Sequence, residues 1–326
     1  MRKRENEKQS DYIRRIVLGK LKYKTIDEDY SELSELVFGK GKQYNSSEVR
    51  KRFYGIRDYL ETLGDNQSDD GYTEVLIMND IHLPYNRDDV LTEIEKNNNV
   101  DYIIIGGDLI DCESCSFWAK WKHPNVTEEL ILAHKFLNEV NEIINPLKTK
   151  IICIRGNHEY RYTREIMNMK EDQLKNLLNP NLLSMLENGF KFYEDGEEIT
   201  YKPIENFTYI NEWYAKLFNN LIVAHPTDFS VVDGKICERA AEYFLNEGIG
   251  DKEDIIVFGH THKHSAMNVN RRQGVYTIEN SCMCKPMDYA NTGKLKFTPQ
   301  NYGYTVLKFK EGKKINKNDI KTVYLN

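Results

Sequence analysis

The chain has 326 residues and a formal net charge of −6 at pH 7, and 40% of its residues are hydrophobic while 29% are charged. This length predicts about two domains, and the composition is that of a globular protein whose six cysteines are free thiols in a reducing cytoplasm. Apolar runs of only four or five residues exclude a membrane-spanning helix, and the charged start MRKRENEKQS excludes a secretory signal.

Three segments within residues 11–63 have the apolar spacing of amphipathic helices: DYIRRIVLGKL, EDYSELSELVFGKG and NSSEVRKRFYGIRDYLETLG. Glycines end each of them, and an Asn-Ser-Ser cap opens the third. The polar stretch GDNQSDDG at 64–71 then predicts a linker. We therefore expect a small all-helical domain over residues 1–66, followed by a second domain over residues 74–326.

Positive charge is concentrated in the N-terminal part of the chain. Residues 1–24 contain nine Lys or Arg and three acids, and residues 40–57 contain six basic residues and one acid. Because the whole chain is net acidic, this asymmetry indicates an anionic partner for the N-terminal domain. A solvated helix surface is the alternative interpretation.

The pattern changes from residue 74 onward. Five short apolar runs, each typical of a buried strand, follow one another as EVLIMND, DYIIIGGD, KIICIRGN, NNLIVAHP and DIIVFGHT. Helical stretches at 87–98 and 127–144 separate the first three runs, which is the alternation of an α/β domain. Residues that follow such strands are expected to converge at the carboxyl edge of a sheet, where α/β proteins bind ligands.

Each of these five runs ends in potential metal ligands. They are Asp80 and His82, Asp108 and Asp111, Asn157 and His158, His225, and finally His260 and His262. Carboxylate oxygens and imidazole nitrogens suit Mn, Fe, Zn or Co, and no thiolate is required. Glycines directly before three of these positions allow tight turns and close backbone approach. The residue types predict a two-metal site of the kind that clamps the oxygens of a phosphoryl group.

The motifs resemble those of the calcineurin-like metallophosphoesterase superfamily over residues 74–308. Its pattern D-x-H, G-D-x-x-D, G-N-H-E, H and G-H-x-H occurs in this order as DIH, GDLID, GNHE, AHP and GHTH. The resemblance implies an α/β fold, a sandwich of two sheets flanked by helices, here preceded by the small all-helical domain. It also implies a hydrolase with two divalent metal ions, for which we expect Mn, with Fe, Zn, Co or Ni as alternatives. The fourth motif departs from many relatives, which have glycine where this chain has Pro226.

The same resemblance implies roles for individual residues. One metal would take Asp80, His82 and His262, the other would take Asn157, His225 and His260, and Asp108 would bridge them. His158 would protonate the leaving oxygen, and Asp111 would orient it, as carboxylates orient histidines elsewhere.

Three further features have no place in this pattern. His264 alternates with two predicted ligands, and we expect it at the rim of the site, partly exposed. The pairs Cys112/Cys115 and Cys282/Cys284 raise the alternative of a structural zinc, although C-x-C spacing favours ordinary buried thiols. Residues 159–224 contain a helical part and then an aromatic-dense part, which could roof the site or stack on bases, with core packing expected for most of the aromatics.

The motifs also bear on the substrate. IRGNHEYR resembles the R-G-N-H-E of protein Ser/Thr phosphatases, but those enzymes carry a phosphate-binding Arg-Gly where this chain has Cys112-Glu113. DIHLP and GDLID are closer to the repair-nuclease and phosphodiesterase branches. This comparison favours a phosphodiester substrate over a phosphoprotein.

The N-terminal helices tilt the choice toward DNA. They resemble the helix-turn-helix module of phage- or prophage-encoded metallophosphoesterases, in which Arg50, Lys51, Arg52 and Arg57 would face DNA. We therefore expect a nuclease that hydrolyses phosphodiester bonds in DNA, in the host cytoplasm if the chain is phage-encoded. One alternative is a phosphatase or cyclic-nucleotide phosphodiesterase whose N-terminal domain serves assembly. Another is a DNA-binding regulatory protein with a vestigial metal domain.

Overall fold

The computed structural model describes residues 71–116, 123–170, 178–194, 196–269, 274–287 and 300–326. The contacts divide the chain after Asp70, and residues 71–326 form one unit. The predicted N-terminal helices, the domain over 1–66 and the candidate DNA-binding residues lie outside the described residues.

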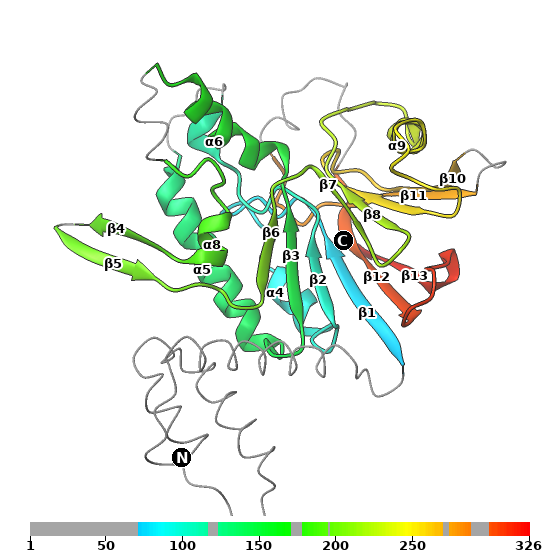
Figure 1. Cartoon of the computed structure of the whole chain (residues 1–326), viewed down its shortest axis with the longest axis horizontal. Helices are drawn as coiled ribbons and strands as arrows, with labels where there is room; N and C mark the ends of the chain where they lie inside the picture. The colour runs from blue at the N-terminus through cyan, green and yellow to red at the C-terminus, as the bar shows by residue number, and fades with distance from the viewer. Residues whose placement is uncertain (1–70, 117–122, 171–177, 195, 270–273, 288–299) are drawn as a thin grey trace, which may run out of the picture. The chain divides into compact units, whose positions relative to one another are not determined.

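A six-stranded sheet forms the first half of this unit (Figure 1). Its order is β13-β12-β1-β2-β3-β6, with β1 (Tyr72–Met78), β2 (Tyr102–Ile105), β3 (Lys150–Ile154), β6 (Phe207–Ile210), β12 (Tyr302–Lys310) and β13 (Ile320–Leu325). The strands β1, β2, β3 and β6 are parallel, whereas β12 runs antiparallel to its neighbours β1 and β13. The first three predicted strands are thereby confirmed as neighbours in one parallel sheet.

A five-stranded sheet forms the second half. Its order is β10-β11-β9-β8-β7, with β7 (Tyr214–Leu217), β8 (Leu221–Ala224), β9 (Ile255–Phe258), β10 (Ser265–Val269) and β11 (Val275–Glu279). The central strands β8, β9 and β11 are parallel. The fourth and fifth predicted strands, β8 and β9, are confirmed, and every residue of both is buried because both faces of this sheet are covered.

Helices and a hairpin complete the unit. They are α4 (Val90–Glu95), α5 (Val126–Ile143), α6 (Asn157–Asn168), α8 (Ser184–Asn188) and α9 (Lys235–Asn246), the 3-10 turns Glu113–Cys115 and Lys317–Asp319, and the hairpin β4 (Phe190–Glu194) and β5 (Glu197–Tyr201). A capping box between Asn125 and Glu128 starts α5, as expected for a helix that follows a loop. The helix predicted over 87–98 corresponds to α4, which is shorter and covers only Val90–Glu95. The predicted helical part after His158 contains α6 and α8, and the aromatic part that follows folds into strands.

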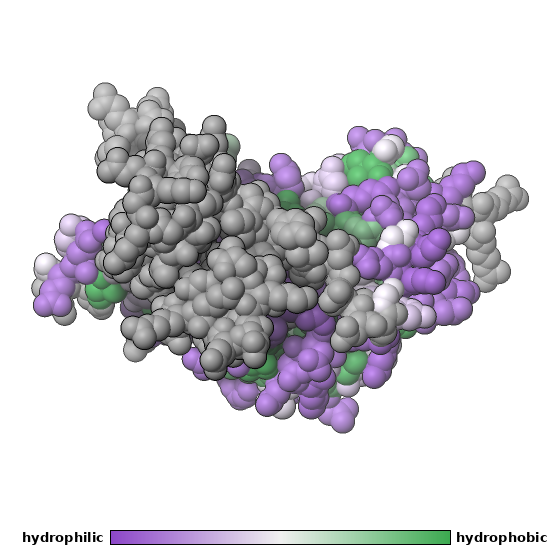
Figure 2. All heavy atoms as spheres, turned by 60° about the horizontal axis from the view of Figure 1, so that its bottom comes forward, coloured by the Kyte–Doolittle hydropathy of each residue, from purple (hydrophilic) through white to green (hydrophobic). Residues whose placement is uncertain are grey.

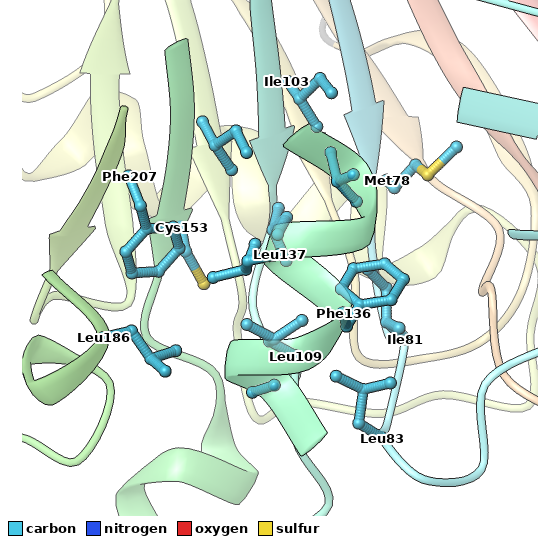
Figure 3. Close-up of a cluster of buried hydrophobic side chains, with 14 of the residues drawn as sticks. Met78, Ile81, Leu83, Ile103, Leu109, Phe136, Leu137, Cys153, Leu186 and Phe207 are labelled. Atoms are coloured by element: carbon cyan, nitrogen blue, oxygen red, sulfur yellow. The ribbon is translucent and has the colours of Figure 1, made fainter. Parts of the chain in front are cut away.

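The alternation of side chains along β1 explains how the layers pack. Leu76 and Met78 join the cluster beneath α4, α5 and α8, which Figure 3 shows around Phe136, Leu137 and Leu186. Val75 and Ile77 point to the opposite face and pack against residues of the second sheet, including Val223 and Val257. On the far side of the second sheet, α9 buries its apolar stripe. The two sheets are therefore packed face to face and flanked by helices, which confirms the predicted fold class.

The surface agrees with this distribution of apolar side chains. On the face shown in Figure 2, hydrophilic residues cover most of the visible described surface and hydrophobic ones form small separate patches. Within the described residues, no helix combines the length and hydrophobicity needed to span a bilayer.

Candidate metal centre

The candidate site lies where the loops after β1, β2, β3, β8 and β9 meet. Parallel strands present their carboxyl ends at the same edge of a sheet, and the face-to-face packing brings the edges of both sheets together. The first sheet contributes Asp80, His82, Asp108, Asp111, Asn157 and His158, and the second contributes His225, His260 and His262. All nine predicted site residues are therefore in one cluster.

One group of donors surrounds His82. Its Nε2 atom lies 3.8 Å from Asp80 Oδ1, 3.6 Å from Asp108 Oδ2 and 3.2 Å from His262 Nε2. The Nδ1 atom of His82 faces Asp111 Oδ1 at 2.9 Å, so the carboxylate can accept its proton and leave the Nε2 lone pair free. Ligand atoms of Asp80, His82 and Asp108 lie within 4.8 Å of one another, close enough to bind a single ion.

A second group shares Asp108 with the first. The Oδ2 atom of Asp108 lies 3.1 Å from His225 Nε2, and Asn157 Oδ1 lies 3.1 Å from His225 Nε2 and 2.7 Å from His260 Nδ1. Asp108, His225 and His260 form a potential metal cluster of their own. The Nδ1 atom of His225 lies 2.8 Å from the Gly106 carbonyl and donates to it, which directs Nε2 toward the site.

His158 stands beside these groups. Its Nδ1 atom lies 2.8 Å from the Asp111 carbonyl oxygen and 3.0 Å from Asp111 Oδ1, and its Nε2 atom lies 3.7 Å from Asp108 Oδ2. Arg161 donates to His158 Nε2 over 2.8 Å and to the Asp111 carbonyl over 3.1 Å. The imidazole is therefore oriented from one side by an aspartate and contacted on its other nitrogen by an arginine.

The backbone is strained where the donors lie. Asp80, His82, Asp108, His260 and His262 all have positive φ, between 52° and 82°. Each such residue costs roughly 1–2 kcal/mol, because a side chain crowds the backbone in this conformation. Strain repeated at five predicted ligands points to a function at these positions, since nothing about an ordinary loop requires it.

Two glycines are needed for the close approach of the strand ends. A Cβ atom at Gly156 would lie 2.0 Å from Asp108 Oδ1, and one at Gly107, where φ is +91°, would lie 2.4 Å from His225 Nδ1. Any side chain at either position would push a donor out of the site. The G-N-H-E and G-D-x-x-D glycines are therefore fixed by the geometry of the donors themselves.

The electrostatics of the cluster are dominated by buried carboxylates. Burial raises the pKa of Asp108, but the adjacent His158 and His225 outweigh burial and hold that pKa well below its usual value. Burial lowers the pKa of His225, and the charge of Asp108 more than reverses this, raising the pKa to about 9. The carboxylates are thus ionised and the surrounding groups are arranged to supply positive charge.

The donor set fits two divalent cations. Carboxylate oxygens, imidazole nitrogens and one amide oxygen are the ligands preferred by Mn and related ions, and Asp108 belongs to both groups. Cys284 also approaches, but its Sγ atom lies 3.7 Å from His262 Nδ1, on the opposite ring nitrogen from the cluster around Asp80. Within the described stretches, the potential metal clusters include one of Cys284 with His82 and His262, but none that joins the two cysteine pairs.

Other predicted features lie around the centre. His264 is half-buried and packs edge-on against Tyr324 with ring centroids 4.6 Å apart, outside the donor cluster. Among the aromatics after His158, Phe190 and Phe207 are buried in the core, as expected for most of them. Tyr193, in contrast, is 73% exposed.

Sequence reasoning missed two residues that shape the site. Glu159 is buried, and its carboxylate accepts hydrogen bonds from the backbone nitrogens of Asp108, Ile110 and Gly156. It thereby ties the loop after β2 to the start of α6. Arg161 is the other, in contact with His158. Both stand in GNHEYR, one and three residues after His158, so their place on the first turn of a helix could have indicated them.

The sequence profile of the calcineurin-like phosphoesterases matches residues 73–264, a range that contains every predicted metal ligand. No curated protein matches the chain. Among solved structures, the chain is similar to Vps29 from Chaetomium thermophilum, with 10% identity and a TM-score of 0.29 over 78% of this chain and 93% of that one. It is also similar to a dimetal phosphatase from Danio rerio, with 8% identity and a TM-score of 0.30 over 78% of this chain and 99% of that one.

Proposed function

Because this chain belongs to the calcineurin-like phosphoesterase family, we propose that it hydrolyses phosphodiester bonds in DNA with two divalent metal ions. The family and the buried Asp and His clusters make it a metal-dependent phosphoesterase. The observation that supports two ions most directly is the position of Asp108, whose single carboxylate belongs to both donor groups.

We assign Asp80, His82 and His262 to one ion, Asn157, His225 and His260 to the other, and Asp108 to both. Mn is the proposed metal, since all these donors are oxygen or nitrogen, and Fe, Zn, Co and Ni remain alternatives. When bound, the pair supplies Lewis acidity toward the phosphoryl oxygens and a nucleophile at neutral pH.

The protein's own residues would position the substrate and move the proton. The His158 backbone nitrogen donates to Asp108 Oδ1 over 2.9 Å, which leaves Oδ2 directed at the donors. We assign His158 as the acid that protonates the leaving oxygen, with Asp111 holding its Nδ1 atom. Burial lowers the pKa of His158, so its acid form requires the added negative charge of a bound phosphate. Arg161 donates to His158 Nε2 in this structure, and it would give up this contact to bind the phosphate instead.

The DNA substrate is supported by charge. Arg50, Lys51, Arg52 and Arg57 belong to the basic N-terminal part, which we propose is a helix-turn-helix-like DNA-binding domain of the phage or prophage type over residues 1–66. All six cysteines are free, which agrees with a cytoplasmic location.

Hydrolysis tests this proposal first. The full chain, stripped of metal and reloaded with Mn, is offered DNA, cyclic nucleotides and phosphopeptides. We expect metal-dependent cleavage of DNA to be the fastest reaction, with none after chelation. Preferential hydrolysis of a cyclic nucleotide or a phosphopeptide would replace the DNA assignment by the alternative phosphodiesterase or phosphatase. No hydrolysis of any substrate would leave a DNA-binding protein with a vestigial site.

Binding tests the N-terminal domain separately. A salt titration of duplex DNA binding compares the full chain with an Arg50/Arg52/Arg57→Ala variant. Each lost phosphate contact is expected to flatten the dependence of log K on log salt by about one unit. A Lys310/Lys313/Lys317→Ala variant removes the same charge from exposed positions of the catalytic unit and is the control. Equal slopes in all three proteins would contradict DNA binding by the N-terminal residues.

A further inference from the structure

A cavity of about 520 Å³ opens directly beside the metal centre. Two of its lining residues, Asn157 and His225, are proposed ligands of the same ion. The rest of the wall comes from the loop after β3, from α6, from the loop between β6 and β7, from the loop after β8 and from α9. The volume falls within the range of small-molecule sites, roughly 300–1,000 Å³. A group bound there would be attached to, or adjacent to, a phosphate held at the centre.

One wall of this cavity is a fixed aromatic surface. The Trp213 ring is stacked on Phe244, with centroids 5.4 Å apart and an interplanar angle of 26°, and lies 5.4 Å from the ring of Tyr243. Phe244 is buried and anchors the stack to α9. The backbone of Trp213 is tied to the metal site as well, because its carbonyl accepts a 2.7 Å hydrogen bond from the nitrogen of His225. The aromatic wall and the metal ligand therefore hold a fixed relation to each other.

The cavity is also lined by Arg155. Its backbone nitrogen donates to the carbonyls of Ile210 and Glu212, and its guanidinium lies 5.1 Å from the ring centroid of Tyr160. Among the described residues, no carboxylate lies within ion-pair distance of this guanidinium. The other arginine of the cavity, Arg239, differs because it is paired with Asp228 at 2.7 Å. The Nη1 atom of Arg155 donates to Asn211 Oδ1 over 3.5 Å, a long bond to a neutral group, so Arg155 is the cation of the cavity that no described carboxylate neutralises.

We propose that this cavity holds one unstacked nucleobase of the substrate, with Trp213 as the stacking surface and Arg155 as a contact for a neighbouring phosphate. This inference rests on the proposed function, and it narrows the substrate to single-stranded or locally unpaired DNA. A base inside a duplex has both faces covered by its neighbours and cannot stack on a protein ring without leaving the helix. Aromatic stacking of this kind tolerates any base, because every base has a flat face.

Equilibrium binding tests the cavity without relying on catalysis. Calorimetry with the full chain, in chelator and therefore without metal, compares deoxyadenosine 5′-monophosphate with deoxyribose 5-phosphate, which lacks the base. We expect the nucleotide to bind more tightly, and the advantage to fall about 5- to 150-fold in Trp213→Ala. Trp213→Phe should retain most of it, which separates loss of stacking from loss of folding. Tyr193→Ala removes an exposed aromatic of β4 and should change nothing.

Turnover measurements then distinguish failure of the proposed hydrolysis from failure of the proposed nucleobase site. Thymidine 5′-(p-nitrophenyl phosphate) and methyl p-nitrophenyl phosphate share a leaving group and differ in the nucleoside. We expect the ratio of their kcat/KM values to favour the nucleoside and to fall in Trp213→Ala. If neither ester is hydrolysed, the proposed function fails while the binding result still decides the cavity. Equal binding with and without the base, an unchanged ratio, or tighter binding of phosphotyrosine than of the nucleotide would each overturn the nucleobase site.

Discussion

The two sheets contribute different chemistry to one centre. The loops after β1 and β2 carry Asp80, Asp108 and Asp111, all essentially inaccessible to solvent, whereas the loops after β8 and β9 provide histidines and no carboxylate ligand. The second half also lines much of the substrate cavity through the β8 loop and α9. The buried carboxylates that attract the metals thus belong to the first half. Much of the cavity wall that could select a substrate belongs to the second half. Changes to the carboxylates of the first half should therefore act on chemistry and metal content, and changes to the cavity wall of the second half on affinity for the substrate.

The largest effect is expected for Asp108→Asn in the first sheet. The amide preserves shape but removes the charge shared by both donor groups, and metal stabilisation of several kcal/mol corresponds to about 10⁴-fold in rate. We expect loss of at least one ion by elemental analysis and hydrolysis of bis-p-nitrophenyl phosphate near background. Asp251→Asn changes an exposed carboxylate of the second half and should be neutral. Normal turnover with two bound ions would refute the bridging role.

His158→Ala separates proton transfer from metal binding within the same half. If His158 is the acid, both ions should remain while hydrolysis slows about 10²–10⁴-fold. The loss should shrink for esters with good leaving groups, which need no proton, when kcat is compared across a leaving-group series. His264→Ala is the matched control, since His264 belongs to the alternating histidines but packs on Tyr324. Loss of metal from His158→Ala would instead make His158 a ligand.

A smaller effect is expected from the surroundings of His262 in the second half. The Gln300 amide nitrogen lies 2.5 Å from His262 Nδ1, and its oxygen accepts a hydrogen bond from the Met287 backbone nitrogen. Metal binding through Nε2 requires Nδ1 to donate, which it can do to Gln300 once the amide is turned to present its oxygen, and outer partners of this kind are worth about 10–100-fold in metal affinity. Gln300→Leu should weaken Mn binding by this factor in a competitive titration, and Asn188→Leu on α8 should not. An unaltered affinity would show that His262 is held by the fold alone.

The smallest effect concerns stability beneath the first-sheet site. Burial raises the pKa of Glu129 to about 8, and its Oε1 atom accepts a hydrogen bond from Glu113 N over 3.0 Å. Since the folded state holds this proton more tightly than the unfolded state, the free energy of unfolding should fall as pH rises from about 5 to 8. Glu129→Gln cannot ionise, so the difference in its stability between pH 6 and pH 8 should be about 1–2 kcal/mol smaller than in the unaltered protein.

Urea denaturation at the two pH values measures this difference. Glu139→Gln lies on the same helix and is exposed, so its stability should follow that of the unaltered protein. Identical pH dependence for Glu129→Gln would mean that the carboxyl ionises without penalty. The raised pKa of Glu129 would then no longer indicate a low-polarity environment beneath the first sheet.

The sequence by itself determined the strands and the donors. The five apolar runs predicted to be strands correspond to β1, β2, β3, β8 and β9. A short apolar pattern between polar ends is enough to predict a buried strand. The donors directly follow those runs, so their convergence could be expected from strand direction alone. The family motifs are local as well, so the sequence carries them without the fold.

The tertiary structure decided what depends on residues far apart in the chain. The late strand β12 pairs with β1 at the start of the unit, a contact that no local pattern encodes. The left-handed backbone at Asp80 and Asp108 is a conformation that aspartate tolerates better than most residues, but no apolar pattern predicts where it occurs. The cavity likewise exists only because Trp213, Arg155 and α9 are brought to the same place by the packing of the two sheets. The local apolar pattern predicts the helices and strands. The assembled site depends on long-range packing, which that pattern does not specify.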